Sequence, residues 1–67
     1  MKHNIDLPNS EIERRINEQI HSERNRRILK MRLVDGMTYE RIAEAVEMSP
    51  RYIRSLIRKL SNILNIA

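Results

Sequence analysis

The sequence has no cysteine, one glycine, two prolines and only two aromatic residues among its 67 residues. The lack of cysteine excludes disulfide bonds, thiolate zinc sites and cysteine nucleophiles. The single glycine, Gly36, excludes a glycine-rich phosphate-binding loop. Turn residues are too few for an all-β domain, because hairpins need them between their strands. No apolar run approaches the roughly 20 residues of a membrane-spanning helix, so we expect an all-α domain that has no membrane span.

What remains is enough for one small domain. Eighteen residues are Ile, Leu or Val, which can form a compact core but not a large one. The first residues lack the apolar stretch of a secretory signal peptide, so we expect a cytoplasmic protein. The two histidines, His3 and His21, form no recognisable ligand pair, and the acidic residues show no partner for acid–base chemistry. We therefore expect no metal, no cofactor and no catalytic residue, and hence no enzyme.

Two helices are predicted in the first half of the chain. Residues 1–9 show no periodicity and are interpreted as an N-terminal arm. Apolar Ile12, Ile16 and Ile20 then recur every fourth residue, behind Ser10 as an N-cap with Glu13 completing a capping box. We interpret this stripe as core. A second helix is expected over residues 23–34, between a cap at residue 22 and the Asp-Gly pair at 35–36; whether residues 10–34 are interrupted at 22 stays open.

Two further helices follow with clear boundaries. Thr38 is expected to cap a helix over 39–46, and Ser49 with Pro50 is expected to start the last helix, over about 50–62. At 3.6 residues per turn, the apolar residues of the last helix share one face, while its basic residues lie on or beside the opposite face. The expected buried set is Ile53, Leu56, Ile57, Leu60, Ile63 and Leu64.

The last two helices match the arrangement of a helix-turn-helix. They are joined by a short turn, and Ala43 supplies a small side chain where the second helix crosses the first. Residues 1–23 carry a net charge of −2 and residues 24–67 a net charge of +6, with four bases and no acid from Ser49 onward. Such a field attracts a phosphate backbone. We predict a small four-helix domain over 10–67, with a three-helix core plus an N-terminal helix, and the helix-turn-helix proper at 38–62.

Three segments also carry a resemblance to a known family. They are DGMTYERIA at 35–43, VEMS at 46–49 and YIRS at 52–55. Together they resemble the helix-turn-helix shared by the fourth region of bacterial sigma factors and the LuxR-type regulators, and RNRRILKMRL at 24–33 resembles the helix that supports it in both. The resemblance covers residues 23–66. It implies transcription-related DNA binding in a prokaryote or a mobile element.

The sequence departs from that family in two respects. Glu47 stands where the family often has glycine, so either Glu47 adopts a left-handed backbone at some cost or the turn differs. The chain also shows neither the further dimerisation helix of LuxR-type domains nor the further domains of sigma factors. We therefore expect a small stand-alone regulator.

The helix over 50–62 is expected to enter the major groove of DNA. The predicted base-contacting residues are Arg51, Arg54, Ser55 and Arg58, because arginine can bind guanine with two hydrogen bonds. The predicted phosphate-contacting residues are Thr38, Tyr39, Tyr52 and Lys59. Thr38 can cap its helix at the same time, and Tyr52 can equally cover the core.

The expected function is that of a sequence-specific DNA-binding transcriptional regulator. Its partner is double-stranded DNA, and a homodimer through the first helix or the C-terminal end would read two half-sites. RNA polymerase is a further candidate partner. Two alternatives stay open: a protein-interaction module that binds RNA polymerase or another regulator through a sigma-like scaffold, and the DNA-recognition subunit of a recombination or packaging complex.

Overall fold

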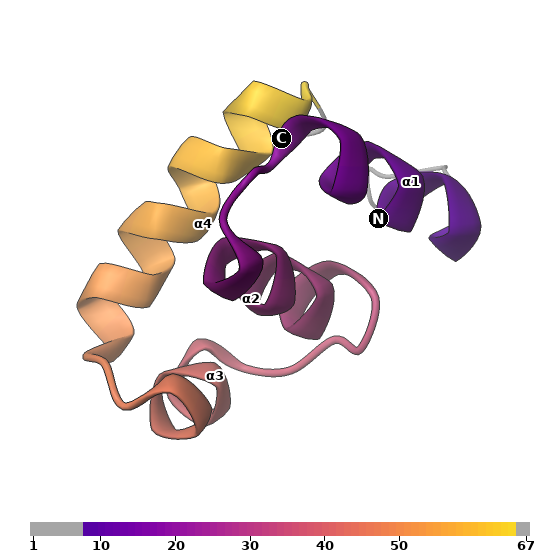
Figure 1. The fold of residues 1–67 in the computed structure, drawn as a ribbon. Coiled ribbons are helices and arrows are strands. Elements are labelled where there is room, and N and C mark those ends of the chain that lie inside the picture. The colour runs from indigo at the N-terminus through magenta and orange to yellow at the C-terminus, as the bar shows by residue number, and fades with distance from the viewer. Residues whose placement is uncertain (1–7, 66–67) are drawn as a thin grey trace.

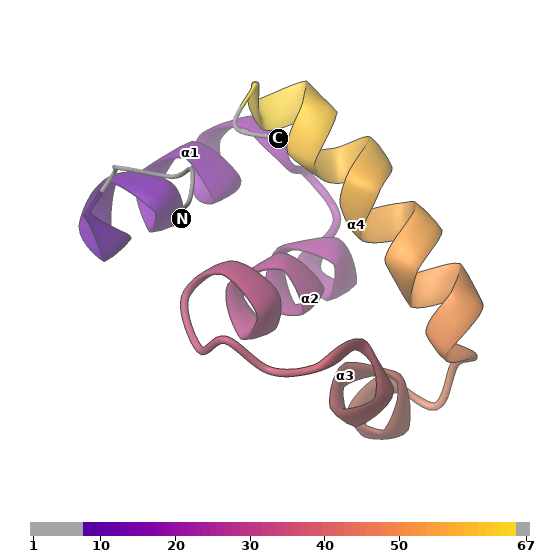
Figure 2. The same ribbon diagram turned by 180° about the vertical axis from the view of Figure 1, so that it is seen from behind.

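The computed structural model describes residues 8–65, which form four helices. These are α1 (Asn9–Gln19), α2 (Glu23–Leu33), α3 (Tyr39–Val46) and α4 (Pro50–Leu64). In Figure 1, α2 lies in the centre, α4 runs along one side of it, and α1 and α3 lie near opposite ends of α4. Figure 2 shows the same arrangement from behind. The predicted all-α, four-helix architecture is confirmed. Residues 1–7 of the expected arm, which include His3, lie outside the described residues, as does Ile66.

Three of the four helices begin at the capping residues that the sequence predicts. The hydroxyl of Ser22 accepts a hydrogen bond from the backbone amide of Asn25 at 3.3 Å. Thr38 and Ser49 accept equivalent bonds at the starts of α3 and α4, both at 3.1 Å. Each bond satisfies an amide that has no partner within its helix. A break at residue 22 therefore separates α1 from α2.

The predicted start of α1 is wrong by two residues. Pro8 occupies the N-cap position with no side-chain cap, and its carbonyl accepts hydrogen bonds from the amides of Glu11 and Ile12. Ser10 therefore lies inside the first turn, and the expected capping box with Glu13 is absent. Pro8 has the extended backbone that is usual at an N-cap, with φ −66° and ψ 156°.

The far end of α1 is held by a side chain from α2. The guanidinium group of Arg26 donates hydrogen bonds to the backbone carbonyls of Asn17 and Ile20. The last carbonyls of a helix lack partners within it and carry partial negative charge, so a cation there is favourable. Arg26 thereby fixes the sharp turn between α1 and α2.

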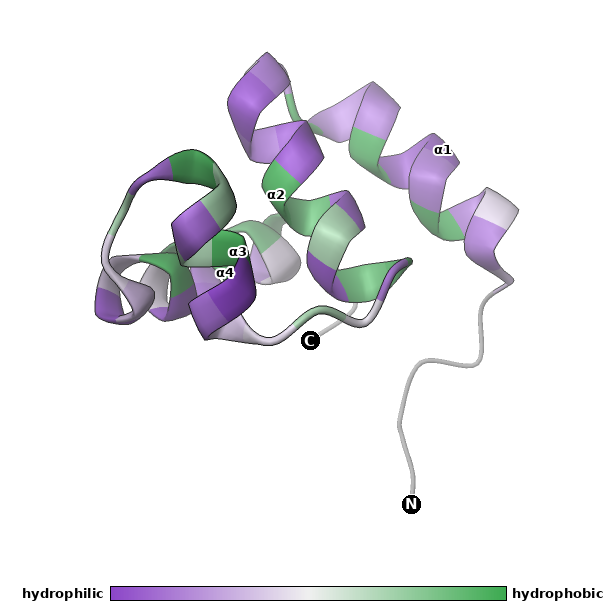
Figure 3. Cartoon of the chain, turned by 90° about the horizontal axis from the view of Figure 1, so that it is seen from below, coloured by the Kyte–Doolittle hydropathy of each residue, from purple (hydrophilic) through white to green (hydrophobic). Residues whose placement is uncertain are grey.

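The core lies between all four helices. Ile12, Ile16 and Ile20 are at most 3% exposed, so the stripe on α1 is core as predicted. Figure 3 shows how hydrophobic and hydrophilic residues alternate along the ribbons of α1 and α2. The other fully or largely buried apolar residues are Ile28, Leu29, Met31, Ile42, Ala43, Ile53, Ile57, Leu60 and Leu64.

One residue of the predicted buried face of α4 is exposed. Ile63 is 53% exposed, whereas Ser61 is 7% exposed. With about 100° of rotation per residue, these two positions lie at opposite margins of the face centred on Ile57, Leu60 and Leu64. Packing covers the Ser61 margin and leaves Ile63 open.

None of the four helices described has the length and the apolar character that a membrane span requires.

Candidate nucleic-acid interface

A left-handed residue closes the turn between α3 and α4. Glu47 has φ 59° and ψ 49°, and its amide hydrogen-bonds the carbonyls of Ala43 and Glu44. The amide of Met48 then bonds the carbonyl of Ala43 at 2.9 Å. Such a backbone ends a helix and redirects the chain, which is why glycine is favoured at this position. Of the two alternatives that the sequence leaves open, Glu47 adopts the left-handed conformation.

Buried apolar residues fix the angle between the two helices. Ile42 and Ile53 are completely buried, and Ala43 is 2% exposed. Val46 and Met48 pack against this core from the end of α3 and from the turn. A tightly packed contact of this kind resists rotation of one helix on the other. The outer face of α4 is therefore held in a fixed orientation relative to the start of α3.

The outer face of α4 carries basic residues from Arg51 to Lys59. The predicted base-contacting residues, Arg51, Arg54, Ser55 and Arg58, are all exposed on this helix, as is Lys59. No acidic residue lies within α4. Within residues 8–65, none of these four cations forms an ion pair; the ion pairs found there all lie within α1. The positive charge of α4 is therefore available to an anionic partner.

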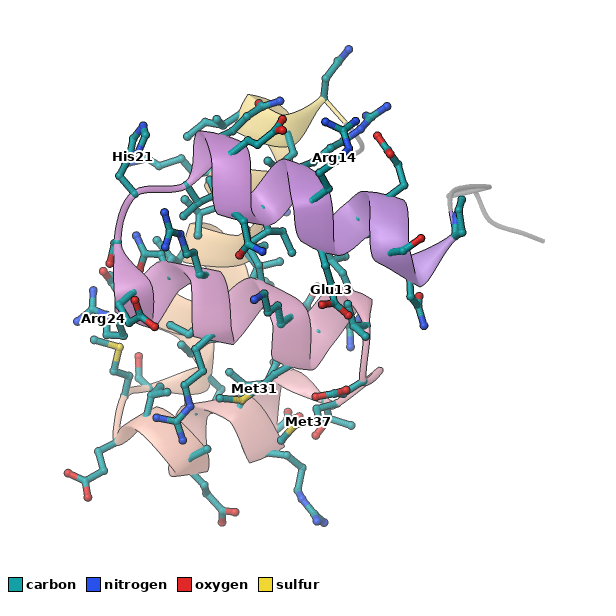
Figure 4. The ribbon with its side chains drawn as sticks, turned by 45° about the vertical axis from the view of Figure 1, so that its right-hand side comes forward. Glu13, Arg14, His21, Arg24, Met31 and Met37 are labelled. Atoms are coloured by element: carbon teal, nitrogen blue, oxygen red, sulfur yellow. The ribbon has the colours of Figure 1, made fainter. Side chains whose placement is uncertain are left out.

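On α1, by contrast, three glutamates and two arginines leave a net charge of −1, and most of them are paired with one another. Hydrogen bonds from Arg14 and Arg15 hold the pKa of the Glu11 carboxyl below its ordinary value. The carboxylates of Glu11 and Glu18 in turn raise the pKa of Arg14. Figure 4 shows Arg14 extending from the side of α1 away from α2, whereas Met31 points from α2 toward α3. The side of the molecule that bears α1 thus offers little net field.

The predicted phosphate-contacting residues lie at the starts of the two helices and along α4. Thr38, Tyr52 and Lys59 are exposed, and Tyr39 is half-buried at the first position of α3. Thr38 caps α3, and its contact with phosphate stays a prediction. Tyr52 is 45% exposed, so part of its side chain faces solvent, and its contact with phosphate stays a prediction.

Arg32 also contributes to the candidate interface, and it was not predicted from the sequence. Its guanidinium group donates a hydrogen bond to the carbonyl of Met37 at 2.9 Å and lies 4.3 Å from the centre of the Tyr39 ring. The guanidinium carbon of Arg54 lies 5.6 Å from the same centre. These distances are within the range of cation–π attraction. No sequence signal distinguishes Arg32 from the other charges of α2, because its contacts form only across the loop at 34–38.

Two other features of the described residues do not extend this interface. A pocket lined by α2, with one residue from α1 and one from the segment after α2, has a lining of mixed charge: Asn17, Glu23, Arg26, Arg27, Lys30, Met31 and Asp35. Over residues 8–65, no group of three or more histidine, aspartate or glutamate side chains is placed to hold a metal ion. The basic face of α4 is therefore the candidate site.

Comparison with known protein families agrees with this geometry. The family model described as sigma-70, region 4, matches residues 22–60, which is more than half of the chain. The chain belongs to this family, a class of DNA-binding helix-turn-helix domains, and the resemblance carried by its motifs is confirmed. The match spans α2, α3 and most of α4, whereas α1 lies outside it. No curated protein and no solved structure matches the chain.

Proposed function

We propose that this protein is a sequence-specific DNA-binding transcriptional regulator that places the 50–62 part of α4 in the major groove. The observation that carries the proposal is the outer face of α4, which is exposed, basic and without ion pairs among the described residues. An α-helix fits the major groove, where base edges can be distinguished from one another. Family membership supports the same geometry.

Within this proposal, the exposed residues of α3 and α4 make two kinds of contact with DNA. Arg51, Arg54, Ser55 and Arg58 face the bases. Thr38 and Tyr39 meet a phosphate at the positively polarised end of α3, while Tyr52 and Lys59 contact phosphates beside the groove. Base contacts then give specificity, and phosphate contacts give position and most of the salt dependence.

The homodimer stays a prediction, through the first helix or the C-terminal end of the chain. The stripe of α1 is buried inside the protomer and cannot also form an interface without unfolding. The C-terminal end of α4, where Ile63 is exposed, is the surface on which a two-fold contact is to be tested. Light scattering of the wild type and of Ile63→Asp measures this directly: a dimer that becomes a monomer in the variant supports the prediction, and a monomeric wild type contradicts it.

Titration of a labelled random-sequence duplex at two salt concentrations tests the proposed function. We expect binding at low salt that weakens as salt rises, with a slope of log K against log salt of about −0.9 for each phosphate neutralised. Selection from a random duplex library should then enrich a defined sequence. Absence of binding at low salt would overturn the proposal, and a complex with RNA polymerase under the same conditions would favour the protein-interaction alternative.

A further inference from the structure

From the contacts around Tyr39 we infer that its ring is a positioning element for Arg54, a role that rests on the proposed DNA-binding function. Tyr39 is the first residue of α3, and Arg54 lies on the second turn of α4. The contact therefore joins the two helices of the motif. The distance of 5.6 Å from guanidinium carbon to ring centre is within the range of cation–π attraction.

The ring is itself held in place from the side of α2. The guanidinium carbon of Arg32 lies 4.3 Å from the ring centre, closer than that of Arg54. Arg32 is half-buried and is fixed by its hydrogen bond to the carbonyl of Met37. Tyr39 is likewise half-buried and packs against the core. The position of the Tyr39 ring is therefore fixed, and Arg54 is the exposed residue of the three.

The contact with the Tyr39 ring restrains Arg54 without tying it to a carboxylate. The N–H groups of a guanidinium group lie in its plane, whereas an aromatic ring attracts the cation through its face. A carboxylate partner would use the same N–H groups that a guanine edge requires. Among the described residues, Arg54 has no ion pair or side-chain hydrogen bond. Its fork of donors thus stays available to DNA while its rotamer freedom is reduced, which lowers the ordering cost of binding.

Arg51 and Arg58 supply the comparison within the same helix. Both are exposed on α4, and within the described residues neither lies over an aromatic ring. Tyr39 should therefore matter to DNA binding through Arg54 and not through its neighbours. This difference separates positioning from a general effect on folding, because a folding defect would weaken the contribution of every arginine on the helix.

A double-mutant cycle on DNA binding tests the role. The probe is the duplex enriched from a random library by the wild type, and the variants are Tyr39→Leu, Arg54→Ala and their combination, with Arg51→Ala in a parallel cycle. We expect Tyr39→Leu to weaken binding about two- to fivefold more when Arg54 is present than when it is absent. The cycle with Arg51 should be additive. An equal cost of Tyr39→Leu with and without Arg54 would overturn the positioning role.

Tyr39→Phe separates the ring from the hydroxyl. If the ring positions Arg54, Tyr39→Phe should keep the coupling to Arg54, even where loss of the hydroxyl weakens binding to enriched and random duplexes alike. Circular dichroism confirms that each variant is folded. Coupling that disappears in Tyr39→Phe would contradict a role for the ring.

Nuclear magnetic resonance of the DNA-free wild type provides a readout that needs no variant. The side-chain protons of Arg54 should be shifted upfield by the ring current of Tyr39, relative to those of Arg58. Absence of that shift overturns the inference even if Tyr39→Leu fails to fold. A wild type that binds no DNA overturns the proposed function, and the positioning role with it, whereas a wild type that binds DNA without coupling overturns the positioning role alone.

Discussion

The hydroxyl of Ser49 accepts a hydrogen bond from the backbone amide of Tyr52 at 3.1 Å, at the point where α4 begins. This bond fixes the start of the helix that carries the basic face, and Pro50 follows it at the first helical position. Ser49 thus lies both at a stability-determining cap and directly before the proposed DNA-contacting residues. Substitutions there can separate the two properties.

Ser49→Ala should destabilise the fold, whereas Ser49→Asp should weaken DNA binding. Alanine removes the cap, which costs about 1 kcal/mol of unfolding free energy. Aspartate keeps the acceptor and places negative charge at the positively polarised end of α4, so stability is retained, but the new charge repels the phosphate backbone. Thermal melting and duplex titration of both variants measure these effects. A lower DNA affinity for Ser49→Ala than for Ser49→Asp would contradict the placement of this helix end near DNA.

Glu47→Gly should stabilise the protein. Glu47 has a left-handed backbone with φ 59°, which strains any residue that has a Cβ atom. Glycine relieves that strain at some cost in unfolded-state entropy, for a net gain of about 0.5–1 kcal/mol. Glu44→Gly is the matched control, because it places glycine within α3 and should cost about 1 kcal/mol. Urea unfolding of both variants measures the free energies, and a destabilised Glu47→Gly would show that its side chain contributes more than the strain costs.

Ile16→Ala should unfold much of the population at 25 °C. Ile16 is completely buried in α1, and truncating such a residue costs about 2–5 kcal/mol. A core of this size supplies only about 3–5 kcal/mol of net stability. Gln19→Ala, at an exposed position of the same helix, should change stability by no more than about 0.5 kcal/mol. A well-folded Ile16→Ala protein would mean that the core within residues 22–60, the region that the family model matches, does not need α1.

Glu11→Gln should lower the melting temperature slightly at neutral pH. The hydrogen bonds from Arg14 and Arg15 hold the pKa of Glu11 below its ordinary value of 4.5 in the folded state. The charged carboxylate therefore stabilises the fold above that ordinary value, and this contribution is lost as pH falls through the lowered, folded-state pKa. The difference in melting temperature between wild type and variant should shrink over the same range. A difference that grows on acidification would contradict the assigned direction.

Local rules predicted most of this fold because the chain follows them at its boundaries. Ser22, Thr38 and Ser49 are caps in the structure as in the sequence, and Gly36 has a positive φ after α2. The start of α1 is predicted wrongly because the sequence pattern indicates Ser10 as the cap, whereas the helix begins two residues earlier, behind Pro8, with no side-chain cap. Local sequence rules cannot choose between residues 8 and 10 as the N-cap when backbone geometry and the packing of the helix end decide.

Features that depend on tertiary packing could not be predicted from the sequence. Ile63 fits the periodic pattern of α4 but lies at its margin, and only the placement of the neighbouring helices decides which margin is covered. The contacts of Arg32 and Arg54 with Tyr39 join three helices that are separate in sequence. The candidate base-contacting residues could be named because helical periodicity places them on or beside the face opposite the buried one, in the second helix of the helix-turn-helix pattern.

The most direct test of the central claim compares two pairs of arginines, one pair on the outer face of α4 and the other elsewhere on the molecule. Arg51→Gln with Arg58→Gln removes two charges from the face of α4, whereas Arg14→Gln with Arg27→Gln removes two from α1 and α2. Fluorescence anisotropy with the enriched duplex should show a loss of affinity of about tenfold or more for the first pair. The second pair should show only the smaller effect of reduced net charge. Equal losses for the two folded variants would contradict the assignment of α4 as the DNA-reading helix.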